Sequence, residues 1–238
     1  MSGTARQWLA FDTSTEVLSI GVAAGTQCST RTLAGGAQSS ASLIPTSLEM
    51  LAQAGLQLGA LDAIVFGRGP GSFTGLRTAC AVAQGLAFGA GIPVLPVDTL
   101  LAVAEEARVL AGVGSAPVCV LALLDARMDE VYSAAWDWDG QRWSVWAPMQ
   151  VGAPQQVVLP EAPRVLMAGN AFAAYADRLP AGERVPALPT AAALLRLAPV
   201  LLADGQAVPA EQAMPLYIRD KVAQTTAERE AARPAGAA

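Results

Sequence analysis

Short, largely apolar runs occupy the beginning of the chain, the last of them alternating with polar residues, and such runs are typical of strands. Three such runs are expected to be strands, at 7–11, 17–24 and 28–33. The first run ends at Asp12-Thr13-Ser14-Thr15, a polar cluster typical of a turn. The opening of the chain is therefore predicted to be an antiparallel meander.

Between residues 42 and 55 the apolar residues recur every three or four positions, which is the spacing of a helix. Ser42 is suited to cap the start of this helix, Pro45 is tolerated in a first turn, and Gly55 can end it. The next predicted elements are a strand at 63–66, a small-residue helix capped by Thr74 and reaching about 89, a strand at 93–97 and a helix that Asp98-Thr99 can cap, reaching about 110.

After residue 112 the order of elements starts again. Strands are predicted at 118–124, 130–138, 143–151 and 164–168, helices near 172–179 and at 190–203, and a last ordered element at 214–222. Pro199 is expected to kink or shorten the second of these helices. Residues 223–238 are polar and rich in alanine, and they are expected to form a frayed tail.

The two halves of the chain resemble each other. Asp12 ends a strand and is followed by Val17-Leu18-Ser19-Ile20, and Asp125 ends a strand and is followed by Val131-Tyr132-Ser133-Ala134. This self-similarity indicates duplication of one α/β subdomain, the architecture of actin-like ATPases. The expected division is an N-terminal subdomain at 1–112, a C-terminal subdomain at 113–222 and a flexible tail at 223–238.

Composition supports a folded protein outside the membrane. Hydrophobic residues make up 53% of the chain and charged residues 15%, which is enough apolar material for a core. No stretch approaches the roughly 20 apolar residues of a membrane span, and the N-terminus lacks the pattern of a signal peptide. A cytoplasmic protein without a membrane partner is expected.

The sequence contains no histidine, which excludes histidine-based catalytic triads, histidine general bases and histidine-containing metal sites. Three scattered cysteines fit neither a disulfide framework nor a zinc site. The net charge is −5 and the only lysine is Lys221, so the chain offers no basic patch for nucleic acid. No metal or cofactor is expected, and in an RNA pathway a partner should hold the RNA.

Glycines are concentrated at Gly69-x-Gly71-x-x-x-Gly75, between a predicted strand and a predicted helix. Backbone N–H groups in such a place can hold an anion. The spacing, however, matches neither a P-loop nor a dinucleotide-binding loop. The other interpretation is that the glycines make a sharp turn and let the helix pack closely against a neighbour, and the sequence leaves both open.

Asp12 and Asp125 could be the paired carboxylates that position a magnesium-bound phosphate in an actin-like fold. The turns after both residues lack glycine, and Arg127 adds a bulky side chain to the second turn. Aspartates at strand ends also commonly cap turns. A weak nucleotide-binding ATPase or kinase is therefore kept as an alternative. No catalytic or metal-binding residue is predicted, and the weak candidates for cofactor binding are Asp12, Gly69, Gly71, Ser72 and Asp125.

A less favoured alternative is an NAD(P)-dependent short-chain dehydrogenase. Asp98 could bind a ribose, and Tyr217-x-x-x-Lys221 matches the proton-relay pair of those enzymes. Against this, a meander and a helix precede the glycine loop, and Pro215 disfavours a helix through Tyr217.

Four tryptophans occupy two adjacent predicted strands, and stacking across a hairpin is their simplest role. A base-stacking platform would need basic neighbours, and only Arg142 is near in sequence. The four are Trp136, Trp138, Trp143 and Trp146.

Three passages resemble the TsaB (YeaZ) family, and their order and spacing fit from the first strand to about Val222. They are Phe11-Asp12-Thr13-Ser14-Thr15, Gly69-Pro70-Gly71-Ser72-Phe73-Thr74-Gly75-Leu76-Arg77 and Pro215-Leu216-Tyr217-Ile218-Arg219-Asp220-Lys221-Val222-Ala223. The resemblance implies an α/β protein with a duplicated actin-like fold (ASKHA, ribonuclease H-like) in which the second subdomain is reduced.

The resemblance also implies partners. Members of the family pair with TsaD, which carries the metal and transfers the threonylcarbamoyl group to the adenosine 3′ of the tRNA anticodon, and an ATPase, TsaE, joins them. TsaD-type proteins bind metal through a His-x-x-x-His motif, which a chain without histidine cannot supply. The implied function is a non-catalytic scaffold or activator subunit that meets tRNA only through the complex.

The helices expected at about 42–54 and 74–89 resemble the pairing surface of the family. Without TsaD, the same patch could support a homodimer. The candidate interface residues on these helices are Leu48, Leu51, Gly75, Ala79 and Ala83.

Overall fold

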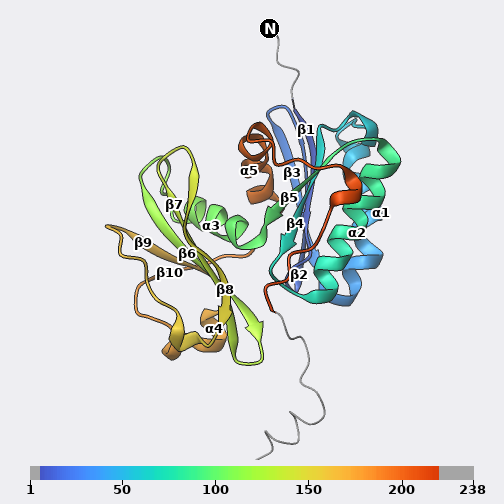
Figure 1. The fold of residues 1–238 in the computed structure, drawn as a ribbon. Coiled ribbons are helices and arrows are strands. Elements are labelled where there is room, and N and C mark those ends of the chain that lie inside the picture. The colour runs from blue at the N-terminus through green and yellow to red at the C-terminus, as the bar shows by residue number, and fades with distance from the viewer. Residues whose placement is uncertain (1–5, 220–238) are drawn as a thin grey trace, which may run out of the picture.

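Two five-stranded sheets lie next to each other in the computed structural model, which describes residues 6–219 (Figure 1). The first has the order β3-β2-β1-β4-β5, with β1 at Gln7–Asp12, β2 at Val17–Ala24, β3 at Gln27–Ala34, β4 at Ala63–Gly69 and β5 at Val94–Asp98. The second has the order β10-β9-β6-β7-β8, with β6 at Val118–Arg127, β7 at Glu130–Trp138, β8 at Trp143–Gly152, β9 at Val165–Gly169 and β10 at Glu183–Pro186. The α-helices are α1 at Ser39–Gln53, α2 at Phe73–Ala90, α3 at Thr99–Leu110, α4 at Phe172–Tyr175 and α5 at Ala191–Ala203. Single turns of 3-10 helix lie at Gly36–Gln38, Leu58–Ala60, Pro154–Gln156, Ala176–Arg178 and Ala210–Gln212.

Both sheets are built by the same path of the chain. The first strand of each half, β1 or β6, pairs antiparallel with the next, which pairs antiparallel with the third. On its other side the first strand pairs in parallel with the fourth, which pairs in parallel with the fifth. The duplicated actin-like fold is confirmed. The second half is also reduced: the counterpart of α1 is a single 3-10 turn, and the counterpart of α2 is the four-residue α4.

Helices form one outer layer and one shared layer between the sheets. α1 and α2 stand side by side over the outer face of the first sheet (Figure 1). α3 and α5 lie between the two sheets, because α3 follows the first sheet yet packs on β6 and β9, while α5 follows the second sheet yet packs on β1 and β2. One apolar core therefore joins the halves, and it includes Trp8, Val65, Leu100, Val120 and Leu194.

Two prolines are tolerated inside helices. α1 begins at Ser39 rather than Ser42, so that Pro45 lies in its second turn and not in its first. α5 continues past Pro199 to Ala203 and is not shortened as predicted. Both prolines are on exposed positions, so the opposite apolar face of each helix packs undisturbed and outweighs the missing N–H donor.

Other boundaries also differ from the sequence prediction. The N-cap of α2 is Ser72 and not Thr74, since the Ser72 hydroxyl accepts a hydrogen bond from the Gly75 N–H at 3.5 Å. The helix expected near 172–179 is split between α4 and a 3-10 turn, and β10 was not predicted. Within residues 6–219, no helix is both long enough and apolar enough to cross a membrane.

The end of the described chain returns to the first sheet and then crosses to the second. Val208 pairs with Val94, and the Leu216 N–H donates to the Arg68 carbonyl at 2.7 Å. Arg219 then donates to the Ala126 carbonyl at 3.1 Å. This stretch has no regular helix or strand at 213–219, in contrast to the ordered element expected at 214–222. The remainder of that element and the expected tail at 223–238 lie outside the described residues, and the subdomain boundary near 112 stays a prediction.

Candidate functional site

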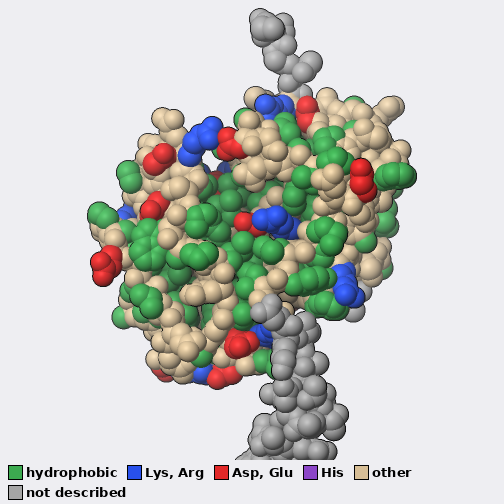
Figure 2. Space-filling view, viewed as in Figure 1, with side chains coloured by type: hydrophobic (Ala, Val, Ile, Leu, Met, Phe, Trp, Pro, Cys, Tyr) green, Lys and Arg blue, Asp and Glu red, His purple; other side chains and the backbone are tan. Residues whose placement is uncertain are grey.

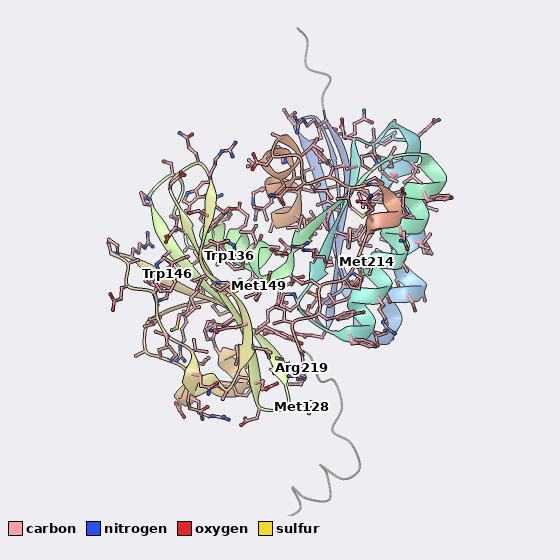
Figure 3. All side chains as sticks on the ribbon, in the orientation of Figure 1. Met128, Trp136, Trp146, Met149, Met214 and Arg219 are labelled. Carbon is pink, nitrogen blue, oxygen red and sulfur yellow. The ribbon has the colours of Figure 1, made fainter. Side chains whose placement is uncertain are left out.

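A cleft of about 490 Å³ separates the two halves at one end of the molecule. The turn after β1, the loop before α2 and the turn after β6 form its sides, and the C-terminal segment at 216–219 runs along it. In Figure 3, Arg219 and Met128 lie next to each other where this segment meets the turn after β6, and the Arg219 guanidinium lies 3.4 Å from the Met128 sulfur. This is the place where an actin-like fold would hold a phosphate, and the candidate residues differ in how they face it.

Asp12 does not reach this cleft, because its side chain is fully buried. Its Oδ1 accepts hydrogen bonds from the Ser14 N–H at 2.8 Å and the Ser14 hydroxyl at 2.6 Å, and its Oδ2 accepts from the Thr99 hydroxyl at 3.4 Å. Burial raises the pKa of Asp12 to about 6, although the hydrogen bonds from Ser14 and Thr99 lower it in part. A carboxylate enclosed in this way cannot contact a metal-bound phosphate in the cleft.

The glycines before α2 serve close packing. A Cβ at Gly71 would lie 2.6 Å from the Ser14 carbonyl oxygen, and a Cβ at Gly75 would collide with the Thr13 carbonyl. Two hydrogen bonds hold this contact, from the Ser72 N–H to the Ser14 carbonyl at 2.7 Å and from the Thr13 hydroxyl to the Gly75 carbonyl at 2.6 Å. Of the two interpretations of the motif, the geometry supports tight packing against the turn after β1 rather than phosphate binding.

Gly69 is covered by the C-terminal segment. A Cβ there would lie 2.6 Å from the Leu216 carbonyl oxygen, and the φ of +120° also favours glycine. Its N–H donates to the Thr99 hydroxyl at 3.1 Å. The second and third sequence motifs therefore fit against each other in space.

Asp125 lines the cleft, but its oxygens are already engaged. Oδ1 accepts from the Arg127 N–H at 2.7 Å and from the Tyr175 hydroxyl at 2.9 Å, and Oδ2 pairs with the Arg127 guanidinium at 3.1 Å. Burial and the adjacent Asp125 carboxylate raise the pKa of Tyr175 to about 12. Asp125 therefore acts as a turn cap in this structure. The Arg127 side chain follows it in the turn, where a phosphate-binding loop would have a small residue.

The dehydrogenase interpretation is contradicted by the fold. The glycine loop follows β4 of a mixed sheet rather than the first strand of a parallel one. Asp98 pairs with Arg68 at 2.6 Å, and Tyr217 lies in the irregular segment, where its hydroxyl accepts from Arg77. Lys221 lies outside the described residues.

Trp138 and Trp143 contact each other across the β7–β8 hairpin, with ring centroids 5.2 Å apart and ring planes at 48°, a tilted pair rather than a parallel stack. Beside it lies a second cavity of about 430 Å³, bounded by α3, α5 and the hairpin. The buried carboxylate of Glu105 accepts there from Arg108, Trp143 and Arg196 at 2.8 to 3.1 Å. Burial alone would raise the pKa of Glu105, but these hydrogen bonds outweigh it and lower the pKa. Figure 2 shows apolar side chains gathered in the groove between the two halves on one face of the molecule.

Four of the five predicted interface residues belong to the core of the subunit itself. Leu48 is 45% exposed, whereas the other four lie on the buried inner faces of α1 and α2: Leu51, Gly75, Ala79 and Ala83. The prediction is corrected in this respect: a pairing surface on these helices must use their outer residues. The outer face of the pair carries Ile44, Leu48, Ala81, Gly85, Phe88 and Gly89.

Two of these outer residues are glycines inside a helix, and the sequence-based prediction did not include them. A Cβ at Gly85 or Gly89 would meet nothing within 4 Å, so the packing of the subunit does not require glycine at either position. Glycine in a helix interior costs about 1 kcal/mol relative to alanine. Two glycines four positions apart within a predicted helix are the signal that could have pointed to this face. Among the described residues, no group of three or more acidic or cysteine side chains is placed to hold a metal ion.

Comparison with known proteins gives one consistent family. The family model TsaD, described as tRNA N6-adenosine threonylcarbamoyltransferase, matches residues 34–227. The tRNA threonylcarbamoyladenosine biosynthesis protein TsaB of Haemophilus influenzae is 35% identical over 90% of this chain and 94% of its own. The TsaB protein of Escherichia coli is 35% identical over 76% of this chain and 80% of its own. The solved structure of YeaZ from Pseudomonas aeruginosa is 36% identical, with a TM-score of 0.82 over 89% of this chain and 99% of that one.

Proposed function

The chain belongs to the TsaB family of tRNA threonylcarbamoyladenosine biosynthesis proteins, and we propose that in this pathway it is a non-catalytic scaffold or activator subunit. Its partner is a TsaD-like subunit, which transfers the threonylcarbamoyl group to the adenosine 3′ of the tRNA anticodon. A TsaE-like ATPase joins the two in the cytoplasm. The net charge of −5 supports a subunit that leaves tRNA binding to the rest of the complex.

The state of the two aspartates supports a non-catalytic role. Asp12 is enclosed by Ser14 and Thr99, and Asp125 is bound by Arg127 and Tyr175. Freeing either carboxylate for a phosphate would require breaking these contacts and moving the turn that holds them. The fold is actin-like, but the aspartates at the ends of β1 and β6 hold the protein's own turns.

The observation that carries the proposal is the outer face of α1 and α2. Its apolar members are Ile44 at 38% exposed, Leu48 at 45% and Phe88 at 75%. Gly85 and Gly89 have no side chains, so the surface of α2 does not protrude at these two positions. The backbone of another helix can therefore approach closely there. This face exposes apolar side chains, and its two glycines lower the stability of the helix. A helical partner that packs on it explains both features best. Without TsaD, a second copy of this chain could use the same face.

Replacing Leu48 by arginine tests this surface. Because Leu48 is half exposed, Leu48→Arg should leave the unfolding temperature of the subunit nearly unchanged. A charge buried at the centre of a helical interface should weaken pairing with the cognate TsaD-like subunit by about 2 kcal/mol or more. Isothermal titration calorimetry measures the affinity.

The matched control is Val158→Arg, at a residue 73% exposed in the loop that follows the 3-10 turn Pro154–Gln156. This variant should pair like the unmodified chain. If Leu48→Arg also pairs with unchanged affinity, the partner does not sit on α1 and α2.

A weak nucleotide-binding ATPase or kinase is the second candidate, and the 490 Å³ cleft between the halves is the observation in its favour. Ser14, Thr15 and Ser72 are among the residues that line it. Titration of the isolated chain with ATP and Mg²⁺ separates the two candidates, because the scaffold subunit should neither bind nor hydrolyse the nucleotide.

A further inference from the structure

Arg77 is held in one orientation by two aromatic side chains. It lies in the second turn of α2, and its guanidinium carbon is 3.9 Å from the centroid of the Phe73 ring. Its Nε donates to the Tyr217 hydroxyl at 3.1 Å, and the Phe73 and Tyr217 ring centroids are 5.4 Å apart. The aromatic pair thus fixes the plane of the guanidinium while leaving the side chain exposed.

The terminal nitrogens of Arg77 have no acceptor in the described part of the chain. Among residues 6–219, nine arginines form ion pairs with carboxylates. Arg6 and Arg184 instead donate to the carbonyls of Pro199 and Ala176. Arg77 alone of this set has only a hydroxyl as acceptor, through Nε. As far as the described residues are concerned, its Nη edge is therefore available for an acceptor from another molecule.

Among residues 6–219, Arg77 is also the charged residue of the outer helical layer that has no ion-pair partner. The sequences of α1 and α2 contain two charged residues, Glu49 and Arg77, and Glu49 pairs with Arg31 at 2.9 Å. Arg77 lies at a shallow groove that includes Thr74, Thr78 and Ala81, next to the apolar outer face of the two helices. A guanidinium at the edge of an apolar patch, fixed by aromatic rings, is a common form of interface hot spot.

We propose that Arg77 is a specificity-determining anchor that binds an aspartate or glutamate side chain of the TsaD-like partner. This inference rests on the proposed pairing through α1 and α2 and adds the chemistry of one contact to it. A carboxylate matches the planar fork of a guanidinium with two parallel hydrogen bonds. Nucleic-acid phosphates are not the favoured ligand, since α1 and α2 carry no second basic residue and the chain is acidic.

The test is the affinity of the full-length chain for its cognate TsaD-like subunit, measured by calorimetry at low and high salt. Arg77→Gln should weaken pairing on the order of 30-fold, because the partner carboxylate is left buried without its counter-charge. Arg77→Lys should recover only part of this, since an ammonium cannot bind bidentately. Tyr217→Phe, which keeps the ring and removes the acceptor of the Arg77 Nε–H, should weaken pairing by about 3-fold through lost orientation.

The control is Arg184→Gln, an exposed arginine on β10 of the other half that bonds to a backbone carbonyl and should pair like the unmodified chain. Thermal unfolding of every variant shows whether the subunit is intact. If Arg77→Gln pairs with unchanged affinity while Leu48→Arg does not pair, the anchor is overturned and the proposed surface stands. If neither variant weakens pairing, the proposed surface fails as well.

A separate measurement distinguishes a carboxylate from a phosphate. The assembled complex should bind tRNA with the same affinity whether it contains Arg77 or Arg77→Gln, at subunit concentrations that keep both complexes intact. Unchanged pairing together with weaker tRNA binding in Arg77→Gln would overturn the proposal and assign the contact to RNA.

Discussion

In the part of the chain that the structure describes, Asp12 is a carboxylate kept away from water without a cationic partner. Its hydrogen-bond donors are the backbone and hydroxyl of Ser14 and the hydroxyl of Thr99, all of them neutral. These donors offset only part of the cost of burial, so the pKa of Asp12 in the folded protein is about 6, against 3.8 for an ordinary aspartate side chain. The carboxylate at the end of β1 therefore lowers the stability of the fold at neutral pH.

Asp12→Asn should make the protein more stable at neutral pH. As the pH rises from about 4 to about 6, the unfolded chain releases the Asp12 proton before the folded chain does, so folding stability falls through this range and stays low above it. Asparagine removes this loss and can still accept from Ser14, so the gain should grow from little at pH 4 to as much as about 3 kcal/mol at pH 7.5. Urea unfolding at the two pH values measures it. A gain that is the same at both pH values would mean that Asp12 does not titrate as the structure implies.

The sequence named Asp12 as a candidate, yet its burial could not be read from its neighbours. The loop with Gly71 and Gly75 covers it from a distant part of the chain, through contacts with Ser14 and Thr13. Similarly, Arg77 was visible as the last residue of a motif, but its lack of an anionic partner depends on which carboxylates the fold brings near. Residue types follow from sequence, whereas their partners follow from tertiary contacts.

α2 contains glycines of two kinds, and the difference defines its two faces. Gly75 lies against the Thr13 carbonyl, where no side chain fits. Gly85 faces open space, where the isolated subunit would be better served by alanine. The packing of the subunit thus fixes the inner face, whereas the outer face is the surface proposed for pairing.

Alanine at these two positions should have opposite effects. Gly75→Ala should lower the free energy of unfolding by about 1–3 kcal/mol, since its Cβ collides with backbone. Gly85→Ala should raise it by about 1 kcal/mol through helix propensity, yet weaken pairing with the TsaD-like subunit because the added methyl keeps the partner helix away. Chemical denaturation and calorimetry on the same samples measure both quantities. A Gly85→Ala subunit that is more stable and pairs as well as before would show that α2 makes no close helix contact.

Most elements could be predicted from their periodicity, and the exceptions have physical causes. The strands of both meanders are short apolar or alternating runs in the sequence, and β2 and β7 have the predicted bounds. β10, with the sequence Glu-Arg-Val-Pro, has too few apolar residues to show a period and forms by pairing with β9. The described part of the ordered element expected at 214–222 has no regular structure, and contacts of the stretch 213–219 with Arg68, Cys80 and Arg77 hold it in place.

The whole molecule is a duplicated fold whose halves have diverged. They share the core around α3 and α5, and Glu105 ties α3, α5 and β8 together through Arg108, Arg196 and Trp143. The first half keeps two long outer helices, while the second half has only α4 and 3-10 turns in their place. The molecule therefore offers one extended helical face, consistent with a subunit whose work is done through a partner.

Reconstitution of tRNA threonylcarbamoylation measures this role directly. The cognate TsaD-like and TsaE-like subunits and the enzyme that supplies threonylcarbamoyl-AMP are assayed on tRNA with this chain, without it, and with its Leu48→Arg variant. We predict that modification requires the unmodified chain, fails with Leu48→Arg, and that the chain alone neither modifies tRNA nor hydrolyses ATP. Equal modification with and without the chain, or turnover of ATP by the chain alone, would contradict the scaffold role and direct attention to the cleft beside Asp125.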